Sequence, residues 1–284
     1  MDTVDELADS CRAHVGPVDV DAVRPRLDGG RVAFVRARDG RRFVVKQHGT
    51  DEGFARELRA YRDWLPQLGE AVPQLVAAEP DRRRLLLTHV DGENATDVPA
   101  DSLREELAHE RAGAFLARLH RVVPSEVSRT FGAELAARLA ARLPRLQTAA
   151  AITARERAAL ERYAERIGRL DAVEVGVCHL DFSPRNWLIR PYGAVAVVDF
   201  EHTKRDALTR DLCRLAHRSW RGRPHLRMAF FRGYRRRLTP NQEHQLALYA
   251  GLEAVTALSL GMDVGDPGML QIGRRLVAEV TGNA

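Results

Sequence analysis

The feature that most constrains the fold is a change of pattern near residue 90. Before it, short apolar runs alternate with turn residues, which is typical of strands. After it, long segments carry apolar residues at helical spacing and begin with helix-start signals. The turn Asp91-Gly92-Glu93-Asn94 falls at the change. We therefore expect two lobes, one over residues 1–90 and one over residues 91–284.

The first lobe is predicted to be a small β-sheet that carries one helix. Residues 30–47 form two apolar runs around the turn Arg38-Asp39-Gly40, and Asp-Gly between such runs is a strong hairpin signal. Apolar side chains recur at helical spacing over residues 52–65 and stop before Pro66, which predicts one amphipathic helix. Two further short apolar runs, 74–78 and 85–90, complete the predicted sheet.

The second lobe is predicted to be mostly helical. Ser102, Thr153 and Thr239 each precede a Glu or Gln by three residues, a pairing that satisfies free backbone N–H groups at a helix start. These signals predict helices near 103–121, 154–170 and 240–258, and Asp266-Pro267 predicts the start of a last one. The only strand-like stretches here are 173–179, 187–190 and 195–200. The expected fold class is therefore α+β, with a small sheet lobe followed by a larger helical lobe.

Composition argues against several classes of protein. The 284 residues, 45% of them hydrophobic, are enough for a substantial core. The N-terminus is acidic and lacks the basic flank and apolar run of a signal peptide, and no apolar run approaches the ~20 residues of a membrane span. Three scattered cysteines suit neither a disulfide framework nor a zinc site. We expect a cytoplasmic protein without a membrane partner, either a monomer or a weak dimer.

The net charge of +5 is a weak signal. Forty-four basic residues face 39 acidic ones along the same helices, which is typical of solvated helix faces rather than of a binding stripe. The arginine runs 82–84 and 235–237 carry no interleaved aromatic residues for stacking on bases. We expect no nucleic-acid partner, although a basic nucleic-acid-binding protein stays the alternative from another class, and steeply salt-dependent RNA binding would favour it.

The most informative segment runs from His179 through Asp181 to Asn186, and one strand later comes Asp199-Phe200-Glu201. Both pieces lie between short predicted strands, so Asp181, Asn186 and Asp199 can converge on one cleft. Hard oxygen ligands of this kind suit Mg²⁺, which completes its shell with phosphates and water. The H-x-D-x-x-x-x-N spacing and the Asp-Phe after it match the catalytic loop and the metal-binding motif of kinases.

Phosphoryl transfer from ATP assigns a role to each of these residues. Lys46, at the end of the second hairpin strand, would hold the α- and β-phosphates, and Glu57 on the following helix would hold Lys46 by an ion pair. Asp181 is the expected catalytic residue, which orients the attacking hydroxyl or accepts its proton. Asn186 and Asp199 would carry Mg²⁺ against the phosphates. The predicted enzyme is an ATP-dependent phosphotransferase with an alcohol group as acceptor.

The chain resembles the aminoglycoside phosphotransferase and choline kinase family over nearly its whole length. That family usually has His-Gly-Asp in the catalytic loop, a metal-binding Asn five positions after the Asp, and a later Asp-Phe-Glu or similar triplet; here Leu180 replaces the Gly. The resemblance implies a two-lobed, protein-kinase-like fold with nucleotide bound by the first lobe. It also implies that Glu201 belongs to the metal site and that Asp211 braces the catalytic loop. A triplet that does not end in Gly argues against an ordinary protein kinase.

The rest of the nucleotide site leaves a fainter signature. Backbone groups near Thr88 and Val90 could pair with the adenine edge where the first lobe ends. The turn Asp28-Gly29-Gly30-Arg31 is not a G-x-G-x-x-G loop. Gly29 and Gly30 would let backbone N–H groups approach a phosphate, but two adjacent glycines are equally consistent with an ordinary turn.

Simpler interpretations apply to several of these residues. Taken singly, Lys46 and Glu57 would be surface residues, and it is their order with the loop motifs that favours a site. His179 is expected to brace the loop. Cys178 is not expected to act as a nucleophile, because its neighbour on a strand points to the opposite face. A catalytically inactive, kinase-shaped scaffold is a further alternative, but a scaffold has no physical need for the full set of site residues.

The resemblance leaves the acceptor open. It favours an antibiotic, either an aminoglycoside or a peptide of the viomycin and capreomycin type, and hence a resistance enzyme. A kinase for choline, homoserine or a sugar is the alternative. A cationic acceptor would need acidic pocket residues, because buried charges require partners. The available acids in the second lobe are Asp206, Glu243, Glu253, Asp263 and Asp266.

Overall fold

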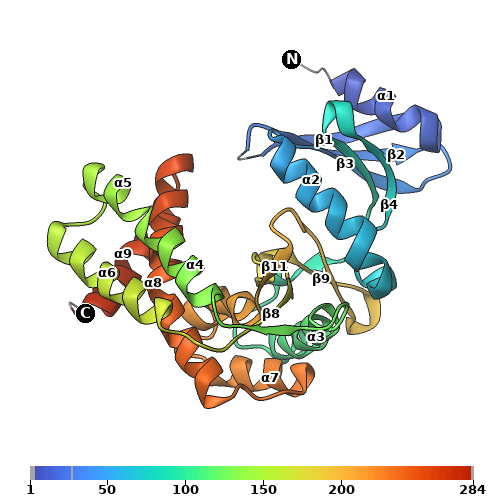
Figure 1. Ribbon diagram of the computed structural model, residues 1–284. Coiled ribbons are helices and arrows are strands. Elements are labelled where there is room, and N and C mark those ends of the chain that lie inside the picture. Colours follow the sequence, from blue (N-terminus) through green and yellow to red (C-terminus); the bar gives the residue numbers. More distant parts are fainter. Residues whose placement is uncertain (1–3, 27, 283–284) are drawn as a thin grey trace.

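The computed structural model describes residues 4–26 and 28–282 and has an α+β organisation, as predicted (Figure 1). A five-stranded antiparallel sheet has the order β1-β2-β3-β5-β4. Its strands are β1 Val18–Pro25, β2 Arg31–Ala37, β3 Arg42–Gln47, β4 Leu75–Glu79 and β5 Arg84–Thr88. The predicted hairpin is confirmed, with Val35 of β2 opposite Phe43 of β3. Strand β5 ends at Thr88, two residues before the predicted end at Val90.

Helices cover both faces of this sheet. Helix α1, Val4–Val15, buries Leu7 and Cys11 against Ala33, Val35, Val45 and Leu86. Helix α2, Asp51–Arg59, buries Phe54 and Leu58 with Leu85 and Leu87, which lie on the opposite face because strand side chains alternate. The sequence predicted neither α1 nor β1, so the expectation of a single helix here is wrong.

The predicted helix over 52–65 is divided in the structure. Thr50 caps α2 by accepting a hydrogen bond from the Gly53 N–H at 3.1 Å. A π-helical turn, Ala60–Trp64, and a 3₁₀ segment, Leu65–Ala71, then follow. Pro66 stands at the start of the 3₁₀ segment, where a missing N–H costs no hydrogen bond, so it does not end the helical path as expected.

The remaining chain is mainly helical, as predicted. Its helices are α3 Leu103–Leu119, α4 Phe131–Ala140, α5 Leu143–Thr148, α6 Ala154–Gly168, α7 Pro224–Tyr234, α8 Pro240–Val264 and α9 Pro267–Thr281. The start signals at Ser102, Thr153 and Thr239 are confirmed, since each side chain accepts a hydrogen bond from the N–H three residues on. Helices α4, α5 and α7 were not predicted. The boundary between two lobes at residue 90 stays a prediction.

Two three-stranded sheets lie within this part, ordered β10-β9-β6 and β11-β8-β7. The strands are β6 Glu93–Asn94, β7 Glu126–Ser128, β8 Val173–Cys178, β9 Trp187–Ile189, β10 Val195–Val197 and β11 Lys204–Ala207. Three of them, β8, β9 and β10, were predicted. The expectation that no other strand occurs here is wrong, because β6, β7 and β11 are too short and too polar to be detected from their sequence alone.

Short helical turns connect these elements. They are Pro80–Arg82, Ala95–Asp97, Pro184–Asn186, Pro191–Gly193, Leu208–Leu212 and the π-helical turn Leu215–Ser219. Pro184–Asn186 lies inside the predicted catalytic loop, and Leu208–Leu212 lies just after β11. Phe182, Trp187 and Phe200 are buried in a core that also includes Leu85 and Leu87 of the first sheet. The strands around the catalytic loop therefore rest on a core that reaches the five-stranded sheet.

By length and hydropathy alone, α8 is a candidate membrane span, and it is the one such candidate within residues 4–26 and 28–282. Fifty-six per cent of its apolar window is buried inside the protein. It packs on α9 and α6 and contributes Leu248, Leu252 and Leu258 to a hydrophobic core. This burial explains the apolar character of α8 by packing within the protein.

Candidate active site

A buried ion cluster joins the sheet, α2 and the loop after β10. The Lys46 Nζ atom lies 2.7 Å from Glu57 Oε1 and 2.7 Å from Asp199 Oδ1. Glu57 is fully buried, and its second oxygen lies 3.1 Å from His48 Nε2. The predicted pairing of Lys46 with Glu57 is confirmed. The contact with Asp199 adds a direct link between the sheet and the loop of the metal-binding motif.

Mutual attraction keeps the side chains of this cluster ionised. Burial would raise the pKa of Glu57 and of Asp199, but the ammonium of Lys46 lowers the pKa of both carboxyl groups below their ordinary values. Burial would lower the pKa of Lys46, yet Asp199 and Glu57 raise it above its ordinary value. Lys46 therefore stays a cation.

Asp181 is held between two arginines that the sequence did not point to. It is 1% exposed. Its Oδ1 atom pairs with Arg214, which follows the Leu208–Leu212 turn, and its Oδ2 atom pairs with Arg185 of the catalytic loop. Burial lowers the pKa of Arg214 to about 10, so this guanidinium remains charged at neutral pH. Both carboxylate oxygens of the predicted catalytic residue thus face cations.

Asp211 braces the catalytic loop through its backbone, as expected. Its carboxylate accepts hydrogen bonds from the backbone N–H of His179 at 2.9 Å and of Leu180 at 2.6 Å. Leu180 has φ 62°, in the left-handed region that favours glycine, which explains why related chains place Gly there. The His179 ring contacts the Val198 carbonyl oxygen at 3.1 Å, so the predicted loop-bracing role of His179 is confirmed.

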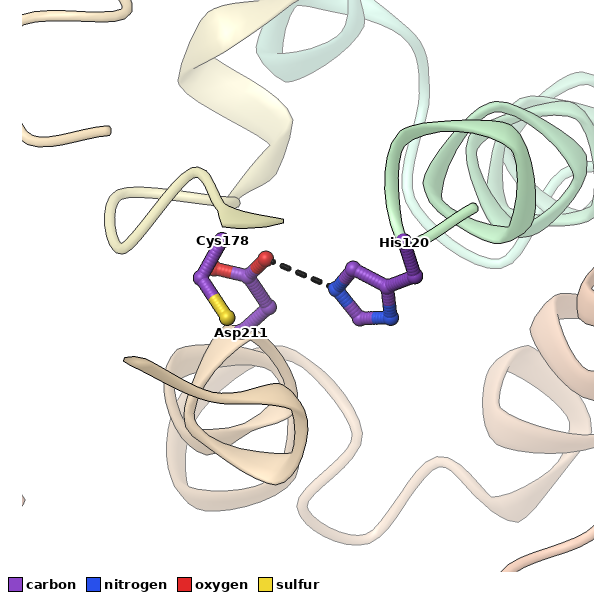
Figure 2. A group of neighbouring side chains, drawn as sticks. All are labelled: His120, Cys178 and Asp211. Carbon is purple, nitrogen blue, oxygen red and sulfur yellow. Dashed lines mark hydrogen bonds and ion pairs between the residues drawn. The ribbon is translucent and has the colours of Figure 1, made fainter. Parts of the chain in front are cut away.

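Figure 2 shows how this brace is itself held. The dashed line joins Asp211 to His120, whose Nε2 atom lies 3.0 Å from Asp211 Oδ2. The other ring nitrogen of His120 contacts the Tyr234 hydroxyl at 2.8 Å. Cys178 lies beside this pair, and its Sγ atom approaches the Asp206 carbonyl oxygen at 3.3 Å. Burial raises the pKa of the Cys178 thiol well above its ordinary value. Each group already has a partner in the chain, so we assign this cluster a structural role.

Asn186 and Asp199 supply oxygen ligands that fit Mg²⁺. The Nδ2 atom of Asn186 donates to the Asp181 carbonyl oxygen at 2.9 Å, which fixes the amide and leaves its Oδ1 atom as the available acceptor. Asp199 uses Oδ1 for Lys46, and its side chain is 31% exposed. Both residues line one cavity. An amide oxygen and a carboxylate oxygen are the hard ligands that Mg²⁺ prefers.

That cavity has a volume of about 680 Å³ and lies between the five-stranded sheet and the catalytic loop. Its sheet side is apolar, with Val32, Phe34, Val44 and Leu87, whereas its other end carries Lys46, Asn186 and Asp199. This distribution of apolar and charged residues fits a nucleotide, with its flat base against the apolar side and its phosphates at the charged end. We call it the nucleotide cavity.

Thr88 and Val90 both line the nucleotide cavity. The Thr88 N–H donates to the Gln74 carbonyl oxygen at 2.9 Å, and the His89 N–H donates to that of Arg42 at 3.0 Å. The N–H of Val90 has no backbone acceptor in the part of the chain that the structure describes. Of the two predicted residues, Val90 therefore offers the available donor for a base edge.

Gly29 and Gly30 are not brought to the wall of this cavity. The Gly29 N–H donates to the Arg26 carbonyl oxygen at 3.2 Å, and the Gly30 N–H donates to Asp28 Oδ1 at 2.9 Å. A Cβ on Gly30 would lie 2.0 Å from the Gln47 carbonyl oxygen, so close packing alone requires glycine there. Their contact with a phosphate stays a prediction.

Arg26 is a further cation of the nucleotide cavity that sequence reasoning missed. Its guanidinium pairs with Glu201, and both residues line the cavity. Burial would lower the pKa of Arg26, but Glu201 and other nearby carboxylates raise it. Glu201 lines the same cavity as Asn186 and Asp199 and pairs with Arg26, and its role in a metal site stays a prediction. Arg26 follows the unpredicted strand β1, so the sequence carried no signal for its position.

A second cavity of about 660 Å³ adjoins the first, because His202 and Leu260 line both. Its walls come from α2, α4, α8 and the segment between β11 and the π-helical turn. Arg214 lines this second cavity, whereas Arg185 lines the nucleotide cavity. The two arginine partners of Asp181 therefore face different cavities. We call the second one the acceptor cavity.

Comparison with known proteins agrees with this geometry. The family model described as "APH: Phosphotransferase enzyme family" matches residues 26–249. No curated protein matches the chain in sequence.

Several solved structures have the same fold. A macrolide 2′-phosphotransferase type I has a TM-score of 0.68 at 19% identity, over 97% of this chain and 98% of that chain. The GDP and kanamycin complex of APH(2″)-IIia has a TM-score of 0.67 at 15% identity, over 96% and 97%. Choline kinase LicA from Streptococcus pneumoniae has a TM-score of 0.66 at 14% identity, over 96% and 98%. The predicted two-lobed, kinase-like fold is confirmed.

Proposed function

Because the chain belongs to the APH phosphotransferase enzyme family, as its catalytic-loop motifs predicted, we propose that it transfers the γ-phosphoryl group of ATP to a hydroxyl group of a small molecule. One observation carries the proposal. Asp181 is buried, and its two oxygens pair with Arg185, which lines the nucleotide cavity, and with Arg214, which lines the acceptor cavity. A base held between these arginines would reach a hydroxyl and a phosphoryl group when the bound substrates draw the arginines away from it.

The nucleotide cavity supplies the charge that the triphosphate needs. Lys46 would bind the α- and β-phosphates while Glu57 holds it in place. Arg26 and Arg185 line the same cavity and would face the outer phosphates. Val90 would pair with the base edge through its free N–H.

Asn186 and Asp199 would hold Mg²⁺, with Glu201 nearby on the same wall. When bound, Mg²⁺ neutralises charge on the β- and γ-phosphate oxygens. Asp199 uses only Oδ1 for Lys46, so its other oxygen would face the cation, and the ammonium of Lys46 keeps the carboxyl group ionised by lowering its pKa.

In the transfer step, the acceptor oxygen forms a bond to the γ-phosphorus while the bond from that phosphorus to the β–γ bridging oxygen breaks. ADP leaves with the electron pair of that bond, and the hydroxyl proton passes to Asp181. Asp211 and His179 keep the loop in place throughout by the backbone hydrogen bonds described above. The protein's main contributions are position and electrostatic stabilisation.

The acceptor is a hydroxylated small molecule, either an antibiotic, which would make the protein a resistance enzyme, or a metabolite. The named neighbours include proteins of both kinds. We place the enzyme in the cytoplasm, where ATP is available, and expect it to act as a monomer or weak dimer.

The first test is ADP release by purified protein with Mg²⁺ and a panel of acceptors that includes aminoglycosides, viomycin-type peptides, choline, homoserine and sugars. We expect Asp181→Ala to lower kcat at least ~100-fold, because general base catalysis contributes that much, while ATP still binds. The exposed Asp171 provides a matched control, and Asp171→Asn should keep full activity.

Two results would contradict the proposal. Unchanged turnover in Asp181→Ala would exclude Asp181 as the base. No ADP release with any acceptor, together with no ATP binding by calorimetry, would favour an inactive scaffold instead.

A further inference from the structure

We infer that the acceptor is a small hydroxylated anion, which carries a carboxylate or a phosphate monoester that the arginines of the acceptor cavity bind. The inference rests on the proposed phosphotransfer and specifies the substrate class of that site. It narrows the expected acceptors to one charge class and disfavours polycationic antibiotics.

The acceptor cavity is lined by an unusual excess of cations. Six arginines and one lysine line it, against two carboxylates, Glu52 and Asp263. Apart from Arg214, these cations are Arg56, Arg138, Arg142, Arg145, Lys204 and Arg210. They come from α2, from α4 and the residues after it, from β11 and from the turn that follows β11. Elements far apart in sequence therefore bring the same charge to one cavity.

Three of these cations have a carboxylate of their own, since Arg56 pairs with Glu52, Arg145 with Asp263 and Arg214 with Asp181. The carboxylates near the other four cations are too few. Asp206 is fully buried and is shared by three of them, at 2.8 Å from Arg210, 3.8 Å from Lys204 and 3.9 Å from Arg138. Glu134 lies 3.4 Å from Arg138 and offers that residue a second, exposed partner. One buried and one exposed carboxylate cannot neutralise three cations, so this group keeps a net positive charge.

Arg142 has no carboxylate partner within 4 Å among the residues that the structure describes. It donates to the Thr256 hydroxyl at 3.4 Å. Partial burial lowers the pKa of its guanidinium, and the nearby charges of Arg210 and Arg138 lower it further, whereas Asp263 opposes them. Arg138 lies in the last turn of α4 and Arg142 two residues after its end, where their like charges repel each other. An anion bound between them would relieve this repulsion.

The triphosphate does not account for these charges. The cations of the nucleotide cavity are Arg24, Arg26, Lys46 and Arg185, and none of them lines the acceptor cavity. Helix α4 and the residues after it do not reach the nucleotide cavity. The excess therefore faces the second substrate.

The acids that a cationic acceptor would need are already paired. Asp206 is engaged as described, Glu253 pairs with Arg218, Glu243 pairs with Arg227 at 2.5 Å, and Asp263 pairs with Arg145. Asp266 caps α9 by accepting from the Gly268 N–H at 2.8 Å. None of the five offers a free carboxylate to an ammonium group. Carboxylate and phosphate monoester groups instead match the bidentate fork of arginine.

The test compares hydroxylated acceptors of similar size and different charge: a hexose 6-phosphate, gluconate, glucose, choline and kanamycin. We expect transfer to the phosphate or the carboxylate compound with the highest kcat/KM, and a KM for it that rises with salt. A higher kcat/KM for the hexose 6-phosphate would indicate a phosphate monoester, and a higher kcat/KM for gluconate would indicate a carboxylate.

Arg142→Gln removes the unpaired charge and keeps a polar side chain. It should raise KM for the anionic acceptor about tenfold or more, the effect of one charge-assisted hydrogen bond, while kcat and the KM for ATP stay within about twofold. Arg162 is exposed on α6, away from the cavity, so Arg162→Gln is the matched control and should change nothing.

A binding readout separates this inference from the proposed transfer. The chain has two lysines, Lys46 and Lys204, and the Lys204 side chain is 45% exposed whereas that of Lys46 is 9% exposed. An amine-acetylating reagent should modify Lys204 first. The anion should slow this modification, by mass spectrometry, in protein saturated with a non-hydrolysable ATP analogue, and Arg142→Gln should remove the protection.

The outcomes are distinct. Protection of Lys204 by an anion without transfer would support an anion-binding cavity and overturn the phosphotransfer. Transfer to a cationic or neutral acceptor, with neither protection nor turnover by the anions, would overturn this inference and leave the phosphotransfer standing. Equal kcat/KM for glucose and its 6-phosphate, with no effect of Arg142→Gln, would also overturn it.

Discussion

At the scale of single residues, the replacement of Lys46 should destabilise the fold strongly. Lys46→Met would leave the buried Glu57 and the partly exposed Asp199 without their cation. We expect the free energy of unfolding to fall by about 3 kcal/mol, since a buried charge that loses its partner is strongly destabilising. Urea unfolding at neutral pH measures this loss.

The double variant Lys46→Met with Glu57→Gln is the control for this explanation. It removes one of the two stranded carboxylates and should recover part of the lost stability. If the double variant is as unstable as the sum of the two single variants, the buried charges are not the cause.

The sequence predicted the residues that match the kinase motifs, and missed the arginines around them, including Arg185 within the catalytic loop. Asp181 and Asn186 are five positions apart, and Asp199 follows one strand later, so their spacing alone indicated a common cleft. Arg214 reaches Asp181 from 33 positions away, through a turn that only tertiary packing defines. Arginine is also too frequent in this chain for any single one to stand out.

At the scale of elements, the start of α6 is held by a polar cluster that also binds α9. Glu156 accepts from the Thr153 N–H at 2.7 Å and lies 2.7 Å from Arg274 of α9. The hydrogen bond from Arg274 lowers the pKa of Glu156 from 4.5 to about 2. We expect Glu156→Gln to cost about 1 kcal/mol of unfolding free energy at pH 7, as for the loss of a cap or a partly exposed ion pair.

The sign of the pH dependence follows from this lowered pKa. The stabilisation by Glu156 is fully present above pH 4.5 and is lost as pH falls toward 2, so the difference between wild type and Glu156→Gln should shrink over that range. Glu161→Gln, which removes a more exposed ion pair on the same helix, is the control. A difference that grows on acidification would contradict this assignment.

Elements with strong periodicity or caps were predicted, and those shaped by neighbours were not. The start signals of α3, α6 and α8 are local hydrogen bonds, so sequence was sufficient. Strand β1 contains a bulge between Val20 and Ala22 and ends at Pro25, which breaks the alternation of apolar residues and is tolerated because β1 is an edge strand. Helix α7 follows Gly222 and Arg223 without a side-chain cap, and it gains its place by packing on α3.

At the scale of the whole molecule, the nucleotide cavity lies between the five-stranded sheet and the catalytic loop, as the lining residues show. A ligand there should stabilise the folded state against unfolding. We expect a non-hydrolysable ATP analogue with Mg²⁺, at 100 times its Kd, to add about 2.7 kcal/mol. That corresponds to a rise of several degrees in Tm for a chain of this size, and thermal unfolding measures it.

The same experiment examines the proposed metal ligands. Omission of Mg²⁺ should reduce the rise in Tm, and Asn186→Ala should lose the Mg²⁺-dependent part, relative to its own ligand-free Tm. An identical rise with and without Mg²⁺ in the wild type would contradict metal binding at this cavity.

The pairing of Asp181 with two arginines also affects the hydrolysis of ATP by water in the absence of an acceptor. Water is abundant and small enough to enter either cavity, and a kinase that activates it would hydrolyse its nucleotide without making product. Both oxygens of the Asp181 carboxylate are engaged by Arg185 and Arg214, so neither is free to accept a hydrogen bond from water. An anionic second substrate would draw Arg214 toward itself and loosen this pairing, so idle hydrolysis should stay slow until the true acceptor arrives. The arginines that select the acceptor would thus also protect the cell's ATP.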